Sequence, residues 1–158
     1  MRLKYLVMVA SLSVLAACSS TPDNAGTTGA TSATPPSTGS SMTPASELQQ
    51  VGDRVFFAFD KSDISSEGTA VLQRQADFMK KYPALTFTIE GHADERGTRE
   101  YNLALGERRA TSVKKALIAL GVPATRINTI SYGKERPAVV GSNEAAYAQN
   151  RRGVTVIN

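Results

Sequence analysis

Apolar and polar residues after position 46 follow two different periods. Apolar residues at every second position, or in short continuous runs, predict strands at residues 54–60, 85–91, 127–132 and 154–157. Apolar residues spaced three or four apart predict helices at residues 65–82 and 98–120, and a short one at 143–150. Leaving the short helix aside, this order predicts an α/β sandwich of βαβαββ topology with helices packed on a mixed four-stranded sheet. The pattern leaves the order of the strands open.

The first predicted strand, residues 54–60, is apolar on both of its alternating faces. Such a strand is expected to be covered on both sides. Ser65 or Ser66 is placed to cap the helix that follows, and Pro83 ends it. The positions of that helix expected to face inward are Val71, Leu72, Ala76 and Met79.

The second long helix has two stripes when its residues are spaced at about 100°. The stripe expected to face the core consists of Leu103, Ala110, Val113, Leu117 and Leu120. A neighbouring stripe consists of Asn102, Leu105 and Arg109. Arg108 points roughly 100° away from Arg109. We therefore expect Arg109, and not Arg108, to lie along the edge of the core and reach the turn at Asp94. Gly121 follows as the expected left-handed residue after the helix.

Charged residues gather in the turn between a strand and this helix, Glu90 to Thr98. Ligands of βα units bind at the carboxyl end of the strand and the amino end of the helix. Asp60 and Asp94 close two strands on the same side if these strands are parallel. Two carboxylates beside Arg109 suit a zwitterion, because the acids take an ammonium group and the guanidinium takes a carboxylate.

Structural roles are the alternative for each of these residues. The aspartates can form turns or cap helices. Arg109 can satisfy a carboxylate or a helix end. His92, in the same turn, is interpreted as a structural residue that forms hydrogen bonds within the turn.

The amino terminus has the pattern of an export signal. Met1–Lys4 is basic, and Tyr5–Val14 is mostly apolar but shorter than the roughly 20 residues that span a membrane. The ending Leu15–Cys18 resembles a bacterial lipobox, which implies a diacylglycerol group on the Cys18 sulfur, cleavage after Ala17 and acylation of the new amino group. The alternative is an ordinary secretory signal. In lipoproteins of the kind that the lipobox resembles, an aspartate after the cysteine implies retention in the inner membrane. Ser19 at that position therefore implies the outer membrane, and the domain is expected in the periplasm.

Residues 18–46 are rich in Ser, Thr, Gly, Ala and Pro. A segment of this composition cannot bury a core and is expected to be a flexible tether. The predicted organisation is therefore a leader at 1–17, a lipidated cysteine with its linker at 18–46, and one domain at 47–158.

Composition excludes several classes of function. The net charge is +4, and +2 without Arg2 and Lys4, which is too small and too mixed with acids for a nucleic-acid surface. One cysteine and one histidine cannot assemble the usual zinc sites, and no cofactor is expected. A hydrolase using Asp60 and Asp94 as an acid pair is disfavoured, because Arg109 would keep both ionised. We expect a binding protein and not an enzyme.

Several segments resemble the OmpA-like domain family, and within it the branch of peptidoglycan-associated lipoproteins. The matching segments are Gly91–Gly97, Asn102–Ala110, Gly121–Val122, Ser131–Glu135 and Asn150–Arg152. The resemblance also covers the layout of lipobox, low-complexity linker and domain. It implies the layered α/β fold predicted above.

The resemblance implies non-covalent binding to the peptidoglycan stem peptide through meso-diaminopimelate. Asp94 would pair with its ammonium group and Arg109 with a carboxylate, while Asp60, Asn102 and Leu105 would form the neighbouring walls. It further implies TolB and other Tol proteins as partners, and a tether between outer membrane and cell wall that supports envelope integrity and constriction at division. The alternative is an OmpA-like lipoprotein that binds peptidoglycan outside the Tol system.

Overall fold

The computed structural model describes residues 42–158. The expected leader 1–17, the expected lipidation site Cys18 and the linker up to residue 41 lie outside the described residues.

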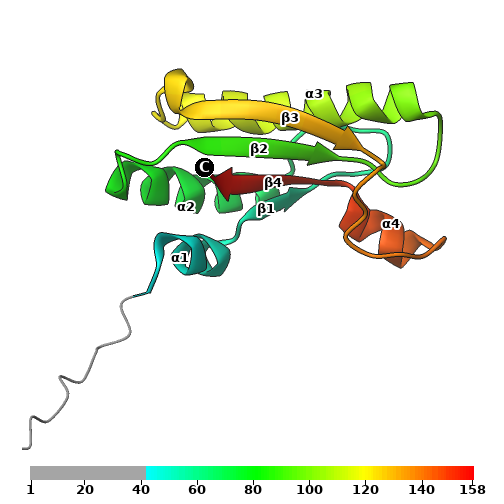
Figure 1. Ribbon diagram of the computed structural model, residues 1–158, viewed down its shortest axis with the longest axis horizontal. Coiled ribbons are helices and arrows are strands. Elements are labelled where there is room, and N and C mark those ends of the chain that lie inside the picture. Colours follow the sequence, from blue (N-terminus) through cyan, green and yellow to red (C-terminus); the bar gives the residue numbers. More distant parts are fainter. Residues whose placement is uncertain (1–41) are drawn as a thin grey trace, which may run out of the picture. The chain divides into compact units, whose positions relative to one another are not determined.

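The domain contains one mixed four-stranded sheet and its helices (Figure 1). The elements are α1 (Pro44–Val51), β1 (Arg54–Phe56), α2 (Ser66–Lys81), β2 (Phe87–His92), α3 (Arg99–Ala119), the short 3-10 helix η1 (Ala124–Arg126), β3 (Ile127–Gly133), α4 (Glu144–Asn150) and β4 (Arg152–Ile157). The strand order is β1-β4-β2-β3. β4 is antiparallel to both neighbours, and β2 and β3 are parallel. The α/β sandwich predicted from the sequence is confirmed.

The main core lies between one face of the sheet and the helices α2 and α3. It is built around the buried side chains of Val55, Leu72, Met79, Phe87, Ile89, Val113 and Leu117. Val71 of α2 is only half-buried and packs against this cluster. No helix in residues 42–158 is long and apolar enough to cross a membrane.

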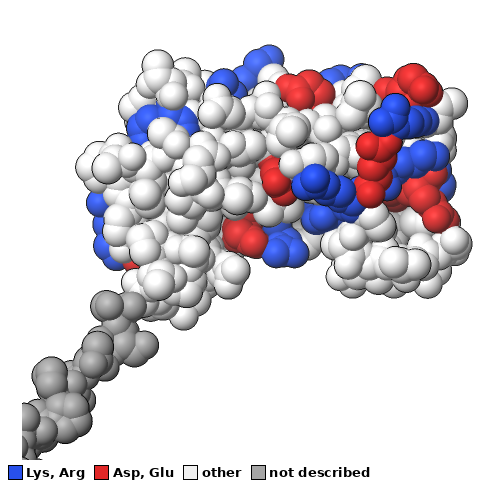
Figure 2. All heavy atoms as spheres, in the orientation of Figure 1, with Lys and Arg blue, Asp and Glu red and all other residues white. Residues whose placement is uncertain are grey.

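The expectation that residues 54–60 form a strand covered on both sides is wrong. β1 contains only Arg54–Phe56 and is an edge strand. Val55 is buried, whereas Arg54 and Phe56 are exposed, because the helices α2 and α3 cover only one face of the sheet. Figure 2 shows the same view with side chains, in which charged residues gather mainly toward the end of the domain where α4 lies.

The expected core stripe of α3 is wrong at Leu103, which is exposed. The buried stripe runs instead through Asn102, Gly106, Arg109 and Val113. The cause is a close approach of two glycines: a Cβ at Gly91 of β2 would lie 1.8 Å from the carbonyl oxygen of Gly106. Because the backbones touch there, the helix is rotated toward Gly106, and Leu103 turns outward.

The helix α1 was not expected from the sequence. Thr43 caps it by accepting a hydrogen bond from Ser46 N, and Pro44 occupies its first turn. Leu48 is its one buried residue, so the segment has no apolar period to detect. The last three residues assigned to the linker, 44–46, are therefore helical.

The direction of the strands brings the predicted site residues to one end of the sheet. β1 and β2 are both antiparallel to β4, so they run in the same direction and their carboxyl ends lie on the same side. Asp60 follows β1, Asp94 follows β2, and α3 begins nearby with Thr98 as its cap. The turn between β2 and α3 is thus a strand-to-helix turn as predicted.

Candidate functional site: a pocket with both signs of charge

A pocket of about 200 Å³ lies at the carboxyl ends of β1 and β2, beside the first turns of α3. Its lining residues are Phe59, Asp60, Asp94, Arg96, Gly97, Tyr101, Asn102, Leu105 and Arg109. All five binding residues expected from the sequence are among them. We call the buried residues Asp94, Asn102, Leu105 and Arg109 the floor, and the more exposed residues Phe59, Asp60, Arg96, Gly97 and Tyr101 the rim.

Arg109 lies deeper than the sequence suggested. Its side chain is completely buried and does not run along the edge of the core. Nε donates to the Lys61 carbonyl (2.9 Å), Nη1 to the His92 carbonyl (2.8 Å) and Nη2 to the Ala58 carbonyl (3.2 Å). These bonds use three of the five donors of a guanidinium. One N–H on each terminal nitrogen has no hydrogen-bond partner within residues 42–158.

The surroundings of Arg109 disfavour the charged form of its guanidinium. Burial, reinforced by the positive charge of Arg151, lowers the pKa of Arg109 to about 10. The group is nevertheless cationic at neutral pH. No ion pair joins Arg109 to a carboxylate in the described part of the chain. The charges of Asp94 and Asp60 act on Arg109 through space and raise its pKa, but neither carboxylate forms an ion pair with it.

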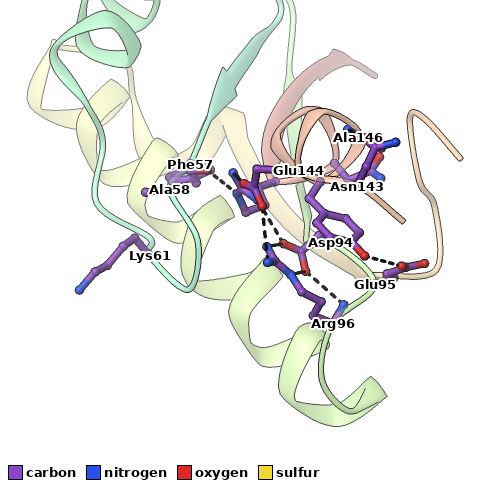
Figure 3. Close-up of polar contacts among 12 residues, drawn as sticks. Phe57, Ala58, Lys61, Asp94, Glu95, Arg96, Asn143, Glu144 and Ala146 are labelled. Carbon is purple, nitrogen blue, oxygen red and sulfur yellow. Dashed lines mark hydrogen bonds and ion pairs between the residues drawn. The ribbon is translucent and has the colours of Figure 1, made fainter. Parts of the chain in front are cut away.

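Asp94 is also buried, and two arginines occupy its oxygens (Figure 3). Arg96 donates to it through N (3.1 Å), Nε (3.2 Å) and Nη2 (2.6 Å), and Arg151 through Nη1 (3.3 Å). Burial by itself raises the pKa of Asp94, but the hydrogen bonds from Arg96 and Arg151 outweigh it and hold the pKa below its usual value. Asp94 is therefore ionised, which does not suit a general acid.

Arg96 and Arg151 were not predicted as site residues. Arg96 stacks between two aromatic rings, 4.1 Å from the centroid of Phe59 and 4.4 Å from that of Tyr147. Its position two residues after Asp94 was a detectable signal, because an aspartate in a turn accepts from the backbone two residues on. Arg151 is 57 residues from Asp94, and spacing gave no signal for it.

Asn102 and Lys134 fix the turn that carries the rim. Asn102 Nδ2 donates to the Arg96 carbonyl (2.8 Å), and Lys134 Nζ donates to the carbonyls of Gly97 (2.6 Å) and Glu95 (3.2 Å). Gly97 has a φ of +92°, which suits glycine. The turn is therefore held from both sides before any ligand arrives.

Asp60 is the accessible carboxylate of the pocket. It adopts a φ of +57°, a conformation that aspartate tolerates better than most residues. One of its oxygens accepts a hydrogen bond from the Tyr101 hydroxyl. Its second oxygen has no hydrogen-bond partner within residues 42–158, and Asp60 lines the same pocket as Arg109.

His92 does not act as a turn hydrogen-bonder through its side chain, contrary to the expectation. Both ring nitrogens are buried without a hydrogen-bond partner in the described residues. Burial, reinforced by the charge of Arg152, lowers the pKa of His92 to about 4, so the ring is neutral. Within residues 42–158, no cluster of three His, Cys, Asp or Glu side chains could hold a metal ion. The arrangement is suited to binding a ligand that carries both charges.

Comparisons with known proteins identify the family of this chain. Residues 56–151 match the model of the OmpA family. A peptidoglycan-associated lipoprotein of Brucella melitensis is 50% identical over 139 residues, covering 87% of this chain and 79% of the relative. That of Haemophilus influenzae is 45% identical over 151 residues, covering 96% and 95%.

Solved structures show the same fold. The crystal structure of the peptidoglycan-associated lipoprotein from Burkholderia pseudomallei is 43% identical with a TM-score of 0.65, covering 67% of this chain and 90% of that one. The carboxyl-terminal domain of Helicobacter pylori MotB, 22% identical with a TM-score of 0.62, shares the fold alone. The match to the family model and to these relatives shows that the chain belongs to the OmpA family.

Proposed function

We propose that the domain binds peptidoglycan without covalent linkage, through the zwitterionic side-chain end of meso-diaminopimelate in an uncrosslinked stem peptide. The observation that carries the proposal is the buried Arg109, which has two free donors and no anionic partner in the described residues, in a pocket that also contains Asp60 and Asp94. The names of the relatives, peptidoglycan-associated lipoprotein, support peptidoglycan as the polymer that is bound.

The two aspartates would contribute differently. The Arg109 guanidinium would take a ligand carboxylate through its two free N–H groups. Asp60 can accept an ammonium group on its free oxygen without losing a protein contact. Asp94 would first have to give up a bond from Arg96 or Arg151. We propose that Asp60 and Asp94 share the ammonium group, which Asp94 reaches only as Arg96 shifts, and that Asn102 and Leu105 form the walls.

The proposed cellular role follows from the expected anchor. Acylation of Cys18 would hold the chain in the outer membrane, and residues after it would let the domain reach the cell wall. The protein would then tether the two layers as part of the Tol–Pal system, with TolB as a partner, and support envelope integrity and constriction. The chain would act by binding and not by catalysis.

Sedimentation with purified sacculi tests the ligand. Sacculi with meso-diaminopimelate should bind the protein, whereas sacculi with L-lysine at that position, which lacks the distal carboxylate, should bind at least about thirtyfold more weakly. Asp60→Asn should weaken binding to the first kind, and Asp63→Asn, an exposed residue outside the pocket, should not. Equal binding to both kinds of sacculi would exclude the proposed ligand.

Two further measurements test the anchor and the partner. Cys18→Ser should abolish labelling with fatty acid and release the chain from the outer-membrane fraction; unchanged labelling would contradict the lipobox interpretation. A pull-down from periplasmic extract, with and without stem peptide, should recover TolB. Its absence in both would favour a wall-binding lipoprotein outside the Tol system.

A further inference from the structure

One side of α3 carries a stripe of exposed and half-buried residues that the proposed site does not use. The stripe consists of Leu103, Glu107, Thr111, Lys114 and Ile118, which lie four, four, three and four residues apart and therefore on one side of the helix. Leu103 is 42% exposed and Ile118 is 38% exposed. Two large aliphatic side chains thus bracket an acid and a base on the surface. We call this set the lateral stripe.

The lateral stripe lies at the outer border of the domain. The Ser131 hydroxyl donates to the Leu103 carbonyl (2.6 Å), and the Thr129 hydroxyl donates to the Glu107 carboxylate (2.9 Å). Both hydroxyls belong to β3, which is the edge strand of the sheet. Figure 1 shows α3 and β3 together along one border of the domain, far from α1. The stripe therefore faces outward beside a strand edge.

The charges of the stripe have no ion-pair partner within the domain. Among residues 42–158, neither Glu107 nor Lys114 has an oppositely charged group within 4 Å. They are seven residues apart, or about 10 Å along the helix axis, which is too far for them to pair with each other. One Glu107 oxygen accepts hydrogen bonds from the Thr111 and Thr129 hydroxyls, and Lys114 is half-buried, but no ion pair within residues 42–158 neutralises either charge.

The order of the residues makes the stripe complementary to itself. If a second α3 lies antiparallel, with the two-fold axis between Ala110 and Thr111, Leu103 lies opposite Ile118 of the second copy. In the same register Glu107 lies opposite Lys114 of the second copy. A two-fold axis repeats each contact, so this pairing has two apolar contacts and two ion pairs. A parallel pairing would place Glu107 beside Glu107 and is disfavoured.

We infer that the lateral stripe of α3 is a docking surface for a second copy of this chain, in an antiparallel two-fold dimer. The pocket lies on the other side of the buried stripe of α3, at its first turns, so the dimer leaves both pockets open. Side-by-side helices pack 8–10 Å apart, which brings the facing side chains of the two stripes into contact.

Charge reversal gives a test that a change in folding cannot imitate. The full chain with Cys18→Ser is examined by sedimentation equilibrium as the parent and as Glu107→Lys, Lys114→Glu and the double reversal. In either single variant both ion pairs become repulsive, so the dimer should weaken at least about tenfold. The double reversal should restore it.

The decisive arm is a mixture of the two single variants. Glu107→Lys presents two lysines and Lys114→Glu presents two glutamates, so each repels itself and attracts the other. By native mass spectrometry, the mixture should form a one-to-one dimer at least about tenfold more tightly than either variant dimerises alone. Lys115→Glu, an equal change of charge at an exposed residue outside the stripe, should leave the parent dimer unchanged. A parent that stays monomeric up to about 1 mM, or a mixture that does not associate, would overturn the inference.

Discussion

Two floor residues of the charged pocket, Arg109 and Asn102, are held by a different kind of contact from the rim. On the floor, Arg109 is bound to three backbone carbonyls and Asn102 to a fourth. On the rim, Asp60 and Tyr101 contact each other through exposed side chains, and Arg96 is held by ring stacking and by Asp94. Backbone contacts fix a group with the fold itself, whereas exposed side-chain contacts can exchange.

This difference explains how one part of the pocket can be fixed by the fold while another part rearranges around a ligand. The buried guanidinium is fixed before the ligand arrives, so its ordering costs nothing at binding. The rim can exchange its internal bonds for bonds to a ligand. A floor residue should therefore affect stability and binding together, and a rim residue should affect binding nearly alone. The predictions below test that separation.

Removing Arg109 should have the largest effect. Arg109→Ala leaves the carbonyls of Ala58, Lys61 and His92 without their donor and creates a cavity, which should cost about 3–5 kcal/mol of unfolding free energy in urea. Arg108→Ala, one residue away and exposed, should cost no more than about 0.5 kcal/mol. If Arg109→Ala were as stable as the parent and had lost only binding, Arg109 would behave as a rim residue and not as a floor residue.

The second largest loss of stability is expected where the backbones of Gly91 and Gly106 are in contact. Gly91→Ala places a Cβ 1.8 Å from the Gly106 carbonyl oxygen, so α3 must move off β2. We expect a loss of about 3 kcal/mol in thermal or urea unfolding. Gly121→Ala is the matched control, because its Cβ would meet only the flexible end of Lys80 at 3.6 Å. Its φ of +93° should cost about 1 kcal/mol. Equal losses at both glycines would mean that the close approach is unimportant.

Asp94 should show an intermediate effect that depends on pH. Because its folded pKa is lowered, its contribution to stability is present above the unfolded pKa of about 3.9 and is lost as the pH falls below it. At pH 7, Asp94→Asn should therefore be about 2 kcal/mol less stable than the parent. The difference in unfolding free energy between the parent and Asp94→Asn should decrease between pH 5 and pH 2 in urea titrations. A difference that stays constant would argue against the arginine contacts as its cause.

Tyr101 should have the smallest effect on stability. Tyr101→Phe removes the exposed hydrogen bond to Asp60, so the unfolding free energy should change by no more than about 0.5 kcal/mol. Binding to sacculi should weaken several-fold, by about 0.5–1.5 kcal/mol, because Asp60 is no longer oriented. Tyr82→Phe removes a comparable bond to Glu47 outside the pocket and should leave binding unchanged. The same loss of binding in both variants would remove the distinction between rim and surface.

The sequence predicted which residues meet, but not how they are bonded. The period of α3 and the direction of two strands were enough to place Asp60, Asp94 and Arg109 around one pocket. The core stripe predicted for α3 was wrong at Leu103 because that prediction assigned the core face from apolar residues alone. Here the buried face contains Asn102 and Arg109, whose burial is compensated by backbone hydrogen bonds.

Long-range partners were the other limit. Arg151 reaches Asp94 because β4 is inserted between β1 and β2, an order that no local pattern encodes. The helix α1 was not predicted because a single buried leucine cannot define a helical period. What local chemistry determines, such as the Ser65 cap of α2 and Gly121 after α3, was predicted correctly.

The direction of the strands also determines how the domain would respond to a pulling force. The chain before Met42 joins the domain through α1, whereas the pocket lies at the carboxyl ends of β1 and β2 (Figure 1). A force between these two points runs along the strands and loads the hydrogen bonds between β1 and β4 in shear, so that several must break together. A domain loaded in this direction resists extension better than one whose strands are peeled apart one bond at a time.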